Sequence, residues 1–220
     1  MNIPFRIGVL GSGKGSNFVA IADAIAAGKI PAEIAMVLSD VEPAGILAHA
    51  RERQIPAQFV PPGKFRTKLD EAAEQAFVAA LENARVDLIV LAGFMRVLKG
   101  NFLRVFEGRI INIHPSLLPS FPGLEPQAQA LRAGVKISGA TVHFVIPETD
   151  AGPILMQGAV AVRDDDTPET LETRILAIEH RIYPAALRLV AGGQIRLEGG
   201  VCKTIGGAGG SESLISPPLV

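Results

Sequence analysis

The chain has 220 residues, of which 48% are hydrophobic and 20% charged, a balance that is ordinary for one globular domain. A formal net charge of −1 gives no electrostatic case for binding nucleic acid or an anionic membrane. Cys202 is the sole cysteine, which excludes an internal disulfide and favours a reducing compartment. Because the sequence shows no N-terminal signal pattern and no apolar run of about 18 residues, we expect a soluble cytoplasmic domain.

The first predicted unit is a strand, a glycine loop and a helix. Arg6–Leu10 is a short apolar run, Gly11–Asn17 has the sequence Gly-Ser-Gly-Lys-Gly-Ser-Asn, and apolar residues at helical spacing follow over Phe18–Ala27. Such a unit presents backbone N–H groups to a phosphate at a helix N-terminus, and Ser16 or Asn17 can cap the helix. The loop matches neither the P-loop nor the dinucleotide motif, so a phosphate monoester fits better than a dinucleotide. A tight structural turn explains the glycines about equally well.

Strands and helices alternate over the next part of the chain. Hydrophobic periodicity predicts strands over 33–39, 57–60 and 87–91, with helices over 43–53 and 66–83 between them. The last of these strands is continuously apolar, which is typical of a parallel sheet that is covered on both faces. Strands separated by helices at this spacing predict βαβ units with right-handed crossovers.

Ala92–Leu98 follows the strand over 87–91, at the carboxyl edge where sheets of this kind bind their ligands. Large apolar residues in such a segment most often serve ordinary core packing into the next helix. A flat aromatic ligand that lies against the segment's backbone is the alternative. The residues alone leave both interpretations open.

The stretch over 110–119 joins a buried β-branched strand to a proline-punctuated loop. Asn112 and His114 are two residues apart, so their side chains point to the same face of the strand. Polar groups at the exit of a buried strand are where open α/β folds keep their chemistry. From spacing alone, two side chains satisfied by neighbouring loop backbone are the more common outcome.

Later in the chain the pattern predicts a change to antiparallel pairing. A helix is expected over 125–133, followed by strands over 135–146 and 154–162 that have no helix between them. We interpret His143, in the first of these strands, as a core or interface histidine. Asp150 lies in the connecting loop and, taken alone, is interpreted as a turn residue.

The last predicted elements are a helix from Thr167 to about Leu189, opened by a cap and a proline, and a short hairpin or edge strand over 194–202. Together the elements predict an α/β fold with a mostly parallel central sheet, helices on both faces and an antiparallel element near the C-terminus. We expect a single domain over 1–203 and a disordered tail, rich in Gly, Ser and Pro, over 204–220.

Several motifs occur together and in order: the glycine loop, Leu-Ala-Gly-Phe-Met-Arg-Val-Leu over 91–98, Asn-Ile-His-Pro-Ser-Leu-Leu-Pro over 112–119, and Val-His-Phe-Val over 142–145 with Asp-Ala-Gly-Pro over 150–153. With these motifs, residues 5–202 resemble the phosphoribosylglycinamide formyltransferases, a family of folate-dependent enzymes of purine synthesis. The resemblance implies a Rossmann-like formyltransferase fold. It also implies transfer of the formyl group of 10-formyltetrahydrofolate, the co-substrate, to glycinamide ribonucleotide.

The resemblance further implies roles for individual residues. The catalytic group would be Asn112, His114 and Asp150. The nucleotide would bind at Gly15, Ser16, Asn17 and Glu179, with Glu179 at a ribose hydroxyl. The folate would bind at Met95, Arg96, Val97, Leu98 and Asn112 and at the loop over 146–150, with Arg66 at its glutamate tail. No metal is required, and His114 with His143 has no metal-ligand spacing.

One segment departs from the family pattern. Many relatives have Gly-Leu-His-Thr-His-Arg-Gln where this chain has Gly-Leu-Glu-Pro-Gln-Ala-Gln over 123–129. The proposed catalytic group does not depend on those histidines. Two alternatives stay open: a 10-formyltetrahydrofolate hydrolase, which would use the same residues on water, and a non-catalytic folate or nucleotide-binding protein. The oligomeric state is left open as well.

The implied catalytic residues suit attack of a neutral amine on an N-formyl carbon. The amide of Asn112 can donate an N–H to the developing oxyanion. An imidazole such as that of His114 can stabilise the oxyanion when charged, or can shuttle the proton. The Asp150 carboxylate would orient this imidazole and stabilise its protonated form.

Overall fold

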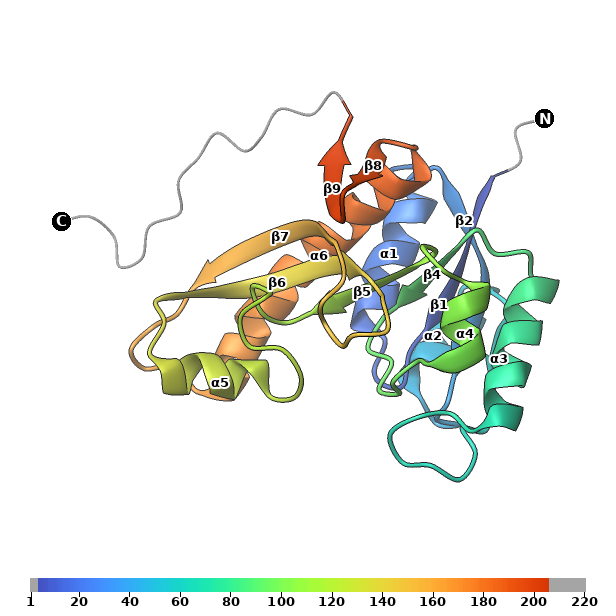
Figure 1. The fold of residues 1–220 in the computed structure, drawn as a ribbon, viewed down its shortest axis with the longest axis horizontal. Helices are drawn as coiled ribbons and strands as arrows, with labels where there is room; N and C mark the ends of the chain where they lie inside the picture. Colours follow the sequence, from blue (N-terminus) through green and yellow to red (C-terminus); the bar gives the residue numbers. More distant parts are fainter. Residues whose placement is uncertain (1–3, 206–220) are drawn as a thin grey trace.

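The computed structural model describes residues 4–205, and within them a 7-stranded sheet has the order β3-β2-β1-β4-β5-β6-β7. The neighbours from β3 to β5 pair in parallel, whereas β6 and β7 join antiparallel (Figure 1). This arrangement confirms the predicted mostly parallel sheet with an antiparallel extension. The strands are β1 (Phe5–Leu10), β2 (Ala32–Ser39), β3 (Ala57–Phe59), β4 (Leu88–Leu91), β5 (Ile110–His114), β6 (Ile137–Phe144) and β7 (Ile154–Ala161).

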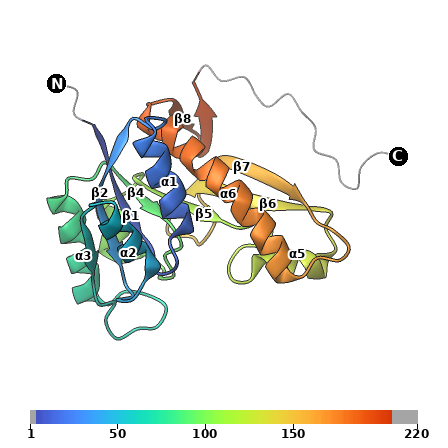
Figure 2. The ribbon, with the colours of Figure 1, turned by 180° about the vertical axis from the view of Figure 1, so that it is seen from behind.

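Helices cover both faces of the sheet, as Figures 1 and 2 show from opposite sides. Along β4, Leu88 and Val90 pack into the core formed with α1, α2 and α6, whereas Ile89 and Leu91 pack into the core formed with α3 and α4. The continuous apolar run of β4 is explained by this burial on both faces. The helices are α1 (Ser16–Ala26), α2 (Gly45–Glu52), α3 (Glu71–Asn83), α4 (Gly100–Val105), α5 (Pro126–Ala133) and α6 (Pro168–Ala191).

The predicted helix over 66–83 was wrong at its start, because α3 begins only at Glu71. The Asp70 side chain accepts a hydrogen bond from the Ala73 N–H, 3.0 Å away, and this bond lowers the pKa of the Asp70 carboxyl. An aspartate at the N-cap favours a helix that starts directly after it. Arg66 therefore lies in an exposed loop before α3.

The expected capping of α1 by Ser16 or Asn17 was also wrong. The N-cap is Gly15, with φ of 81°, and no side chain makes a capping hydrogen bond there. A Cβ atom on Gly15 would lie 2.8 Å from the Cα of Ile46 on α2. Both the left-handed backbone and this close approach require glycine at the position.

The C-terminal part follows the prediction closely. Thr167 caps α6, because its side chain accepts from the Thr170 N–H, and Pro168 occupies the first helical position. The predicted hairpin is formed by β8 (Ile195–Glu198) and β9 (Val201–Thr204), which pair antiparallel. Of the expected tail, residues 206–220 lie outside the described part of the chain.

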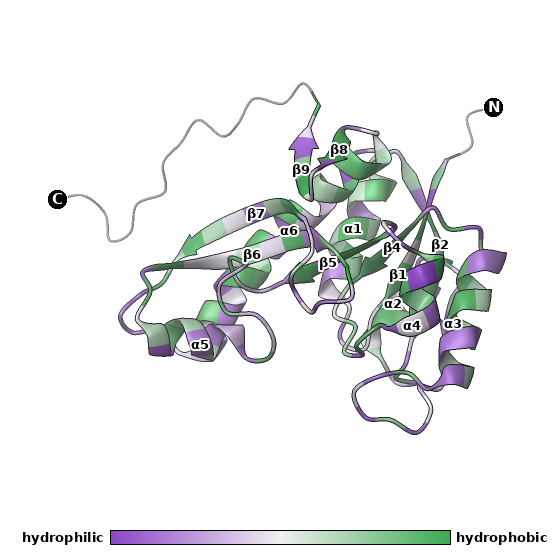
Figure 3. Cartoon of the chain, in the orientation of Figure 1, coloured by the Kyte–Doolittle hydropathy of each residue, from purple (hydrophilic) through white to green (hydrophobic). Residues whose placement is uncertain are grey.

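Hydrophobic residues concentrate on the central strands, and hydrophilic residues gather on α3 at the outside of the fold (Figure 3). Between residues 4 and 205, no helix combines the length and apolarity that a bilayer crossing requires.

The fully buried Tyr183 of α6 ties this helix to the sheet. Its hydroxyl lies 2.9 Å from the Leu91 carbonyl oxygen and 3.2 Å from that of Ile111, so one O–H is shared between β4 and β5. Burial raises the pKa of this phenol well above its ordinary value. The hydroxyl is therefore a neutral donor to the last residue of β4 and to a residue near the start of β5.

We predict that Tyr183→Phe lowers the free energy of unfolding by about 1–3 kcal/mol, because it leaves buried carbonyl groups without their donor. Urea denaturation followed by circular dichroism measures this loss. Fluorescence is unsuited, because Tyr183 is the sole tyrosine and the chain has no tryptophan. An unchanged transition midpoint at an unchanged slope would show that the hydroxyl bond contributes nothing.

Candidate active site

The site lies where the strand order reverses. The neighbours β1 and β4 lead into loops on opposite sides of a crevice at the carboxyl edge of the sheet, which is the usual ligand position in this architecture. The Ser12 N–H, in the loop after β1, donates to the Gly93 carbonyl oxygen, 3.0 Å away in the loop after β4. The glycine loop and the Gly93 segment are therefore held side by side.

A cleft of ≈ 400 Å³ opens beside this crevice. Four segments line it: 91–98 at the end of β4 and after it, 112–115 at the end of β5, 123–126 at the start of α5, and 143–150 at the end of β6 and after it. Asn112, His114 and Asp150 therefore border the same space as the apolar segment around Met95. Residues far apart in the chain therefore meet at this cleft.

His114 is held between two acceptors. Its side chain is buried, its Nε2 lies 3.0 Å from the carbonyl oxygen of Phe121, and its Nδ1 lies 3.5 Å from Oδ2 of Asp150. Because a carbonyl oxygen can only accept, Nε2 carries the proton that donates to it. The Asp150 carboxylate lies beside the other ring nitrogen, so the ring is placed between a carbonyl oxygen and a carboxylate.

Asp150 is fixed by its backbone and by the loop opposite. Its φ of 53° is in the left-handed region, which a residue with a side chain seldom adopts. Such a conformation costs free energy and is kept where the surroundings demand it, often at functional sites. The Gly123 N–H donates to Oδ2 of Asp150 at 2.8 Å. The carboxylate is thus aimed at His114 from a different loop.

His143 borders this site, whereas its place in the sequence predicts a core or interface histidine. It is buried, as predicted for a core residue, yet it lies directly opposite Asn112 in the antiparallel β5–β6 pair. Its Nε2 is 3.4 Å from Nδ2 of Asn112 and 3.8 Å from Oδ1 of Asp150. The strand pattern alone does not reveal cross-strand register, so no feature of the sequence pairs His143 with Asn112.

The protonation of His143 follows from its surroundings. Burial lowers its pKa, the main effect, although the Phe144 carbonyl oxygen and the Asp150 charge act in the opposite direction. Its Nδ1–H donates to the Phe144 carbonyl oxygen at 2.9 Å, which leaves the Nε2 lone pair to accept from the Asn112 amide. A neutral His143 therefore orients Asn112 so that the amide presents an N–H to the cleft.

The loop after His114 is braced from β6. The Thr141 hydroxyl donates to the Ser116 carbonyl oxygen at 2.7 Å and accepts from the Leu118 N–H at 3.0 Å. Gln157 of β7 donates to the Leu118 carbonyl oxygen at 2.8 Å. These buried bonds leave the loop that carries Phe121 little freedom, so the acceptor of the His114 ring is fixed in place.

Asn17 and Glu179 meet at the start of α1. Nδ2 of Asn17 donates to Oε2 of Glu179 on α6 at 2.7 Å, and both side chains are buried. Oδ1 of Asn17 is buried without a hydrogen-bond partner among residues 4–205. Burial raises the pKa of Glu179, an effect that the Asn17 bond partly offsets. The structure thus joins Asn17 of the glycine loop to Glu179.

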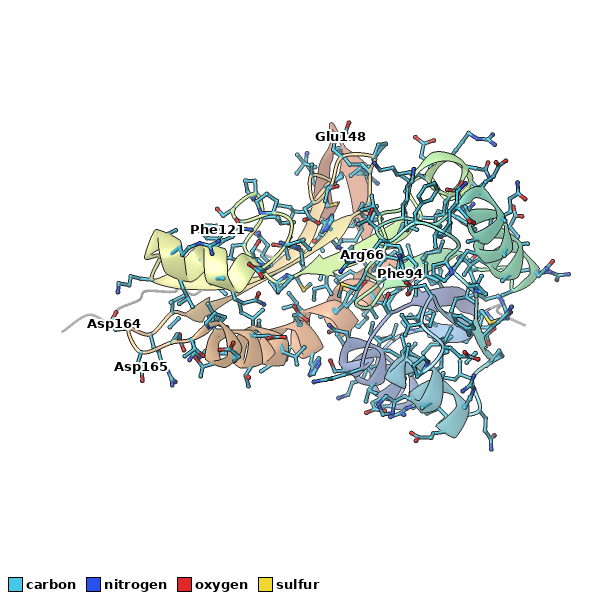
Figure 4. The ribbon with its side chains drawn as sticks, turned by 90° about the horizontal axis from the view of Figure 1, so that it is seen from below. Arg66, Phe94, Phe121, Glu148, Asp164 and Asp165 are labelled. Atoms are coloured by element: carbon cyan, nitrogen blue, oxygen red, sulfur yellow. The ribbon has the colours of Figure 1, made fainter. Side chains whose placement is uncertain are left out.

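Two arginines that the sequence associates with folate have other contacts. Nε of Arg96 donates to Oδ2 of Asp40 at 2.6 Å, and its Nη1 donates to the carbonyl oxygens of Phe65 and Arg66. Arg96 lines the cleft, but its guanidinium is already bound to Asp40 and to these carbonyl oxygens. Arg66, labelled in Figure 4, is exposed in its loop and is not among the residues that line the cleft.

No group of three or more His, Cys, Asp or Glu residues within 4–205 is placed to hold a metal ion.

Comparison with known proteins decides the family. Residues 5–187 match the family described as formyl transferase. The chain belongs to this family. Among its relatives, the phosphoribosylglycinamide formyltransferase of Bacillus subtilis is 41% identical over 187 residues, which cover 85% of this chain and 95% of that protein. The glycinamide ribonucleotide transformylase 1 of Symbiobacterium toebii superposes with a TM-score of 0.88 at 46% identity, covering 93% and 98% of the two chains.

Other relatives have a different length or name. The trifunctional purine biosynthetic protein adenosine-3 of Bos taurus is 42% identical over 199 residues, so this chain spans 20% of the length of that animal protein. The formyltetrahydrofolate deformylase of Pseudomonas syringae has a TM-score of 0.85 at 27% identity. The deformylase therefore shares the fold but is further from this chain in sequence than the formyltransferases.

Glu179 provides a pH-dependent prediction. Because its pKa is raised in the folded state, the folded state loses stability as the pH rises from the unfolded to the folded pKa, and this loss persists at neutral pH. Glu179→Gln keeps an acceptor for Asn17 without the charge. We expect this variant to melt at a higher temperature than the wild type at neutral pH, with the difference vanishing near about pH 4.

Thermal melts across this pH range, made without substrate, measure the effect. The exposed Glu82 on α3 offers a control, and Glu82→Gln should follow the wild-type profile. A Glu179→Gln variant that tracks the wild type at every pH would show that the buried carboxylate has no cost.

Proposed function

We propose that this chain transfers the formyl group of 10-formyltetrahydrofolate to the amine of N1-(5-phospho-D-ribosyl)glycinamide, a step of IMP biosynthesis. The observation that supports this most directly is the convergence of Asn112, His114 and Asp150 on one cleft. The relatives named phosphoribosylglycinamide formyltransferase support the choice of substrates. The protein is an enzyme in this proposal, with both small molecules as its substrates.

The reaction begins when the neutral amine attacks the formyl carbon and produces a tetrahedral oxyanion. The Asn112 amide, oriented by His143, donates an N–H to this oxyanion. The His114 ring can supply positive charge to the oxyanion when it is protonated, and the nearby Asp150 carboxylate would stabilise that charge. When the bond from carbon to the folate N10 breaks, N10 gains a proton and the attacking nitrogen loses one. His114 can give a proton to N10 and take one from the attacking nitrogen.

The two substrates would occupy adjoining parts of the crevice. The backbone N–H groups of Gly15, Ser16 and Asn17, at the first turn of α1, are suited to the nucleotide phosphate. The buried Glu179 carboxylate is suited to accept from a ribose hydroxyl. The unpartnered Oδ1 of Asn17 leaves an acceptor that the nucleotide can satisfy.

The folate would lie in the cleft against the segment that contains Met95, Arg96, Val97 and Leu98, and against the loop over 146–150. Flat pterin rings suit a slot with apolar side chains and backbone polar groups. Arg66, in the exposed loop next to this segment, would meet the negatively charged glutamate tail. We further propose a cytoplasmic location, supported by Cys202, which is a free thiol.

A hydrolase is the second candidate, since water could attack the same formyl carbon. It is disfavoured because the named deformylase is 27% identical, against 46% for the transformylase from Symbiobacterium toebii. The Asn17–Glu179 pair also has no evident use when water is the acceptor.

The decisive experiment incubates the protein with 10-formyltetrahydrofolate and follows deformylation, with and without glycinamide ribonucleotide. Turnover that depends on the nucleotide supports formyl transfer. Turnover without it indicates a hydrolase, and no turnover indicates a binding protein. A third reaction with the unphosphorylated riboside tests the glycine loop. If the riboside is formylated as efficiently as the nucleotide, the glycine loop does not bind the phosphate.

We predict that His114→Ala and Asp150→Asn each lower kcat/KM by about 10²–10⁴-fold, the range for removing a positioned acid–base group. Asn112→Ala should lose about 10²–10³-fold, as for an oxyanion donor. Steady-state rates measure these losses, and circular dichroism checks that each variant is folded.

Asp164 provides the matched control for these variants. It lies at the end of the molecule away from Arg66 and Phe94 in Figure 4, and it pairs with the exposed Lys136. Asp164→Asn should turn over as the wild type does. Rates near wild type for His114→Ala or Asp150→Asn would remove those residues from the mechanism.

A further inference from the structure

A buried ion pair outside the catalytic group connects the two proposed substrate sites. Nε of Arg96 and Oδ2 of Asp40 are 2.6 Å apart, and the side chains are 16% and 1% exposed. Asp40 follows the end of β2, whereas Arg96 lies in the segment that lines the cleft. The mechanism above uses neither charge.

The second carboxylate oxygen of Asp40 reaches the glycine loop. The Ser12 hydroxyl donates to Oδ1 of Asp40 at 2.5 Å, and the same hydroxyl accepts from the Met95 N–H at 2.9 Å. The Ser12 backbone N–H is bound to the Gly93 carbonyl oxygen. Both oxygens of Asp40 are therefore used, one toward the nucleotide side and one toward the folate side.

The guanidinium of Arg96 reaches a further segment. Its Nη1 donates to the Phe65 carbonyl oxygen at 2.8 Å and to that of Arg66. The Val97 N–H donates to the Thr67 carbonyl oxygen at 2.9 Å and extends the same attachment. The loop that carries Arg66 is thus tied to the folate segment by backbone groups that Arg96 and Val97 bind.

Stability alone gives little reason for such a pair. Removing two charges from water is costly for each ion, and apolar residues of similar volume often stabilise a fold equally well. A carboxylate and a planar guanidinium, however, fix the direction of every bond they make. This pair makes its bonds to three loops that carry the proposed substrate contacts.

We propose that Ser12, Asp40 and Arg96 are positioning residues that set the placement of the folate segment relative to the glycine loop and to the loop of Arg66. This inference rests on the proposed function for the identity of the two substrates. The Arg96 side chain acts on folate through the backbone it holds rather than as a ligand. Its loss should weaken folate binding more than nucleotide binding, because Ser12 keeps its bond to Asp40.

The test separates positioning from stability with a pair of variants. Arg96→Met removes the guanidinium and leaves Asp40 buried without its partner, so it should melt at a lower temperature and raise the KM for 10-formyltetrahydrofolate about tenfold or more. Adding Asp40→Asn removes the stranded charge and keeps an acceptor for Ser12. This double variant should regain melting temperature while its folate KM stays high.

Arg96→Lys adds a graded comparison. Lysine keeps a charge for Asp40 but lacks the fork that also reaches the Phe65 and Arg66 carbonyls, so it should recover stability and only part of the folate KM.

The Asp166–Arg174 pair is the matched control. It has nearly the same burial, 2% and 23% exposed, and a contact of 2.8 Å, and it lies between the loop after β7 and α6. Arg174→Met should lower the melting temperature and leave both KM values at wild type. The positioning role is overturned if the folate KM of the Asp40→Asn/Arg96→Met double variant returns to the wild-type value together with the melting temperature. It is also overturned if Arg174→Met raises the folate KM as much as Arg96→Met does.

Hydrogen exchange makes the result independent of turnover. Peptides that contain 64–68 and 93–98 should exchange faster in the Arg96→Met variant, and not in Arg174→Met, because the bonds that tie these segments together are lost. Unchanged exchange in these peptides would overturn the inference even if the enzyme transfers formyl groups as proposed. If the wild type transfers no formyl group but Arg96→Met still exchanges faster in these peptides, the proposed function is overturned. The attachment of the segments by Arg96 then stands.

Discussion

The antiparallel pairing of β5 with β6 is the constraint on which the site depends. A parallel neighbour of β5 would have required a crossover connection from the carboxyl edge of the sheet back to its amino edge, usually through a helix. Antiparallel β6 instead places His143 opposite Asn112 and returns the chain to the sheet through the loop that carries Asp150. The catalytic carboxylate reaches His114 because of this reversal, and the Gly123 N–H holds it there.

The site keeps polar groups in places where apolar ones would stabilise the fold better. Burial raises the pKa of Glu179, and an oxygen of Asn17 has no partner within residues 4–205. Unsatisfied buried polar groups cost free energy, and native proteins retain them chiefly where a ligand or reaction requires them. The left-handed backbone of Asp150 belongs with these costs. These three unfavourable local features, at Asn17, Glu179 and Asp150, lie at proposed substrate-binding or catalytic positions.

Rigidity of the crevice comes from polar side chains that bind backbone of other loops. Thr141 holds the loop after His114, and Asp40 with Arg96 holds the loops around the folate segment. Loops of this kind have few apolar contacts of their own, so directional hydrogen bonds determine their shape. The loops lie at the carboxyl edge of the sheet, and these hydrogen bonds fix their positions there.

The sequence alone determined the alternation of strands and helices, the doubly covered parallel strands and the motif-bearing loops, because these depend on local periodicity and on the spacing of Gly and Pro. It predicted neither the start of α3 at Glu71 nor the N-cap at Gly15, where one capping carboxylate and one close helix contact decided the boundaries. Only the tertiary structure decided that His143 orients Asn112 and that Arg96 binds Asp40. Both contacts join residues distant in the chain, and strand register and loop packing, which no local pattern encodes, bring them together.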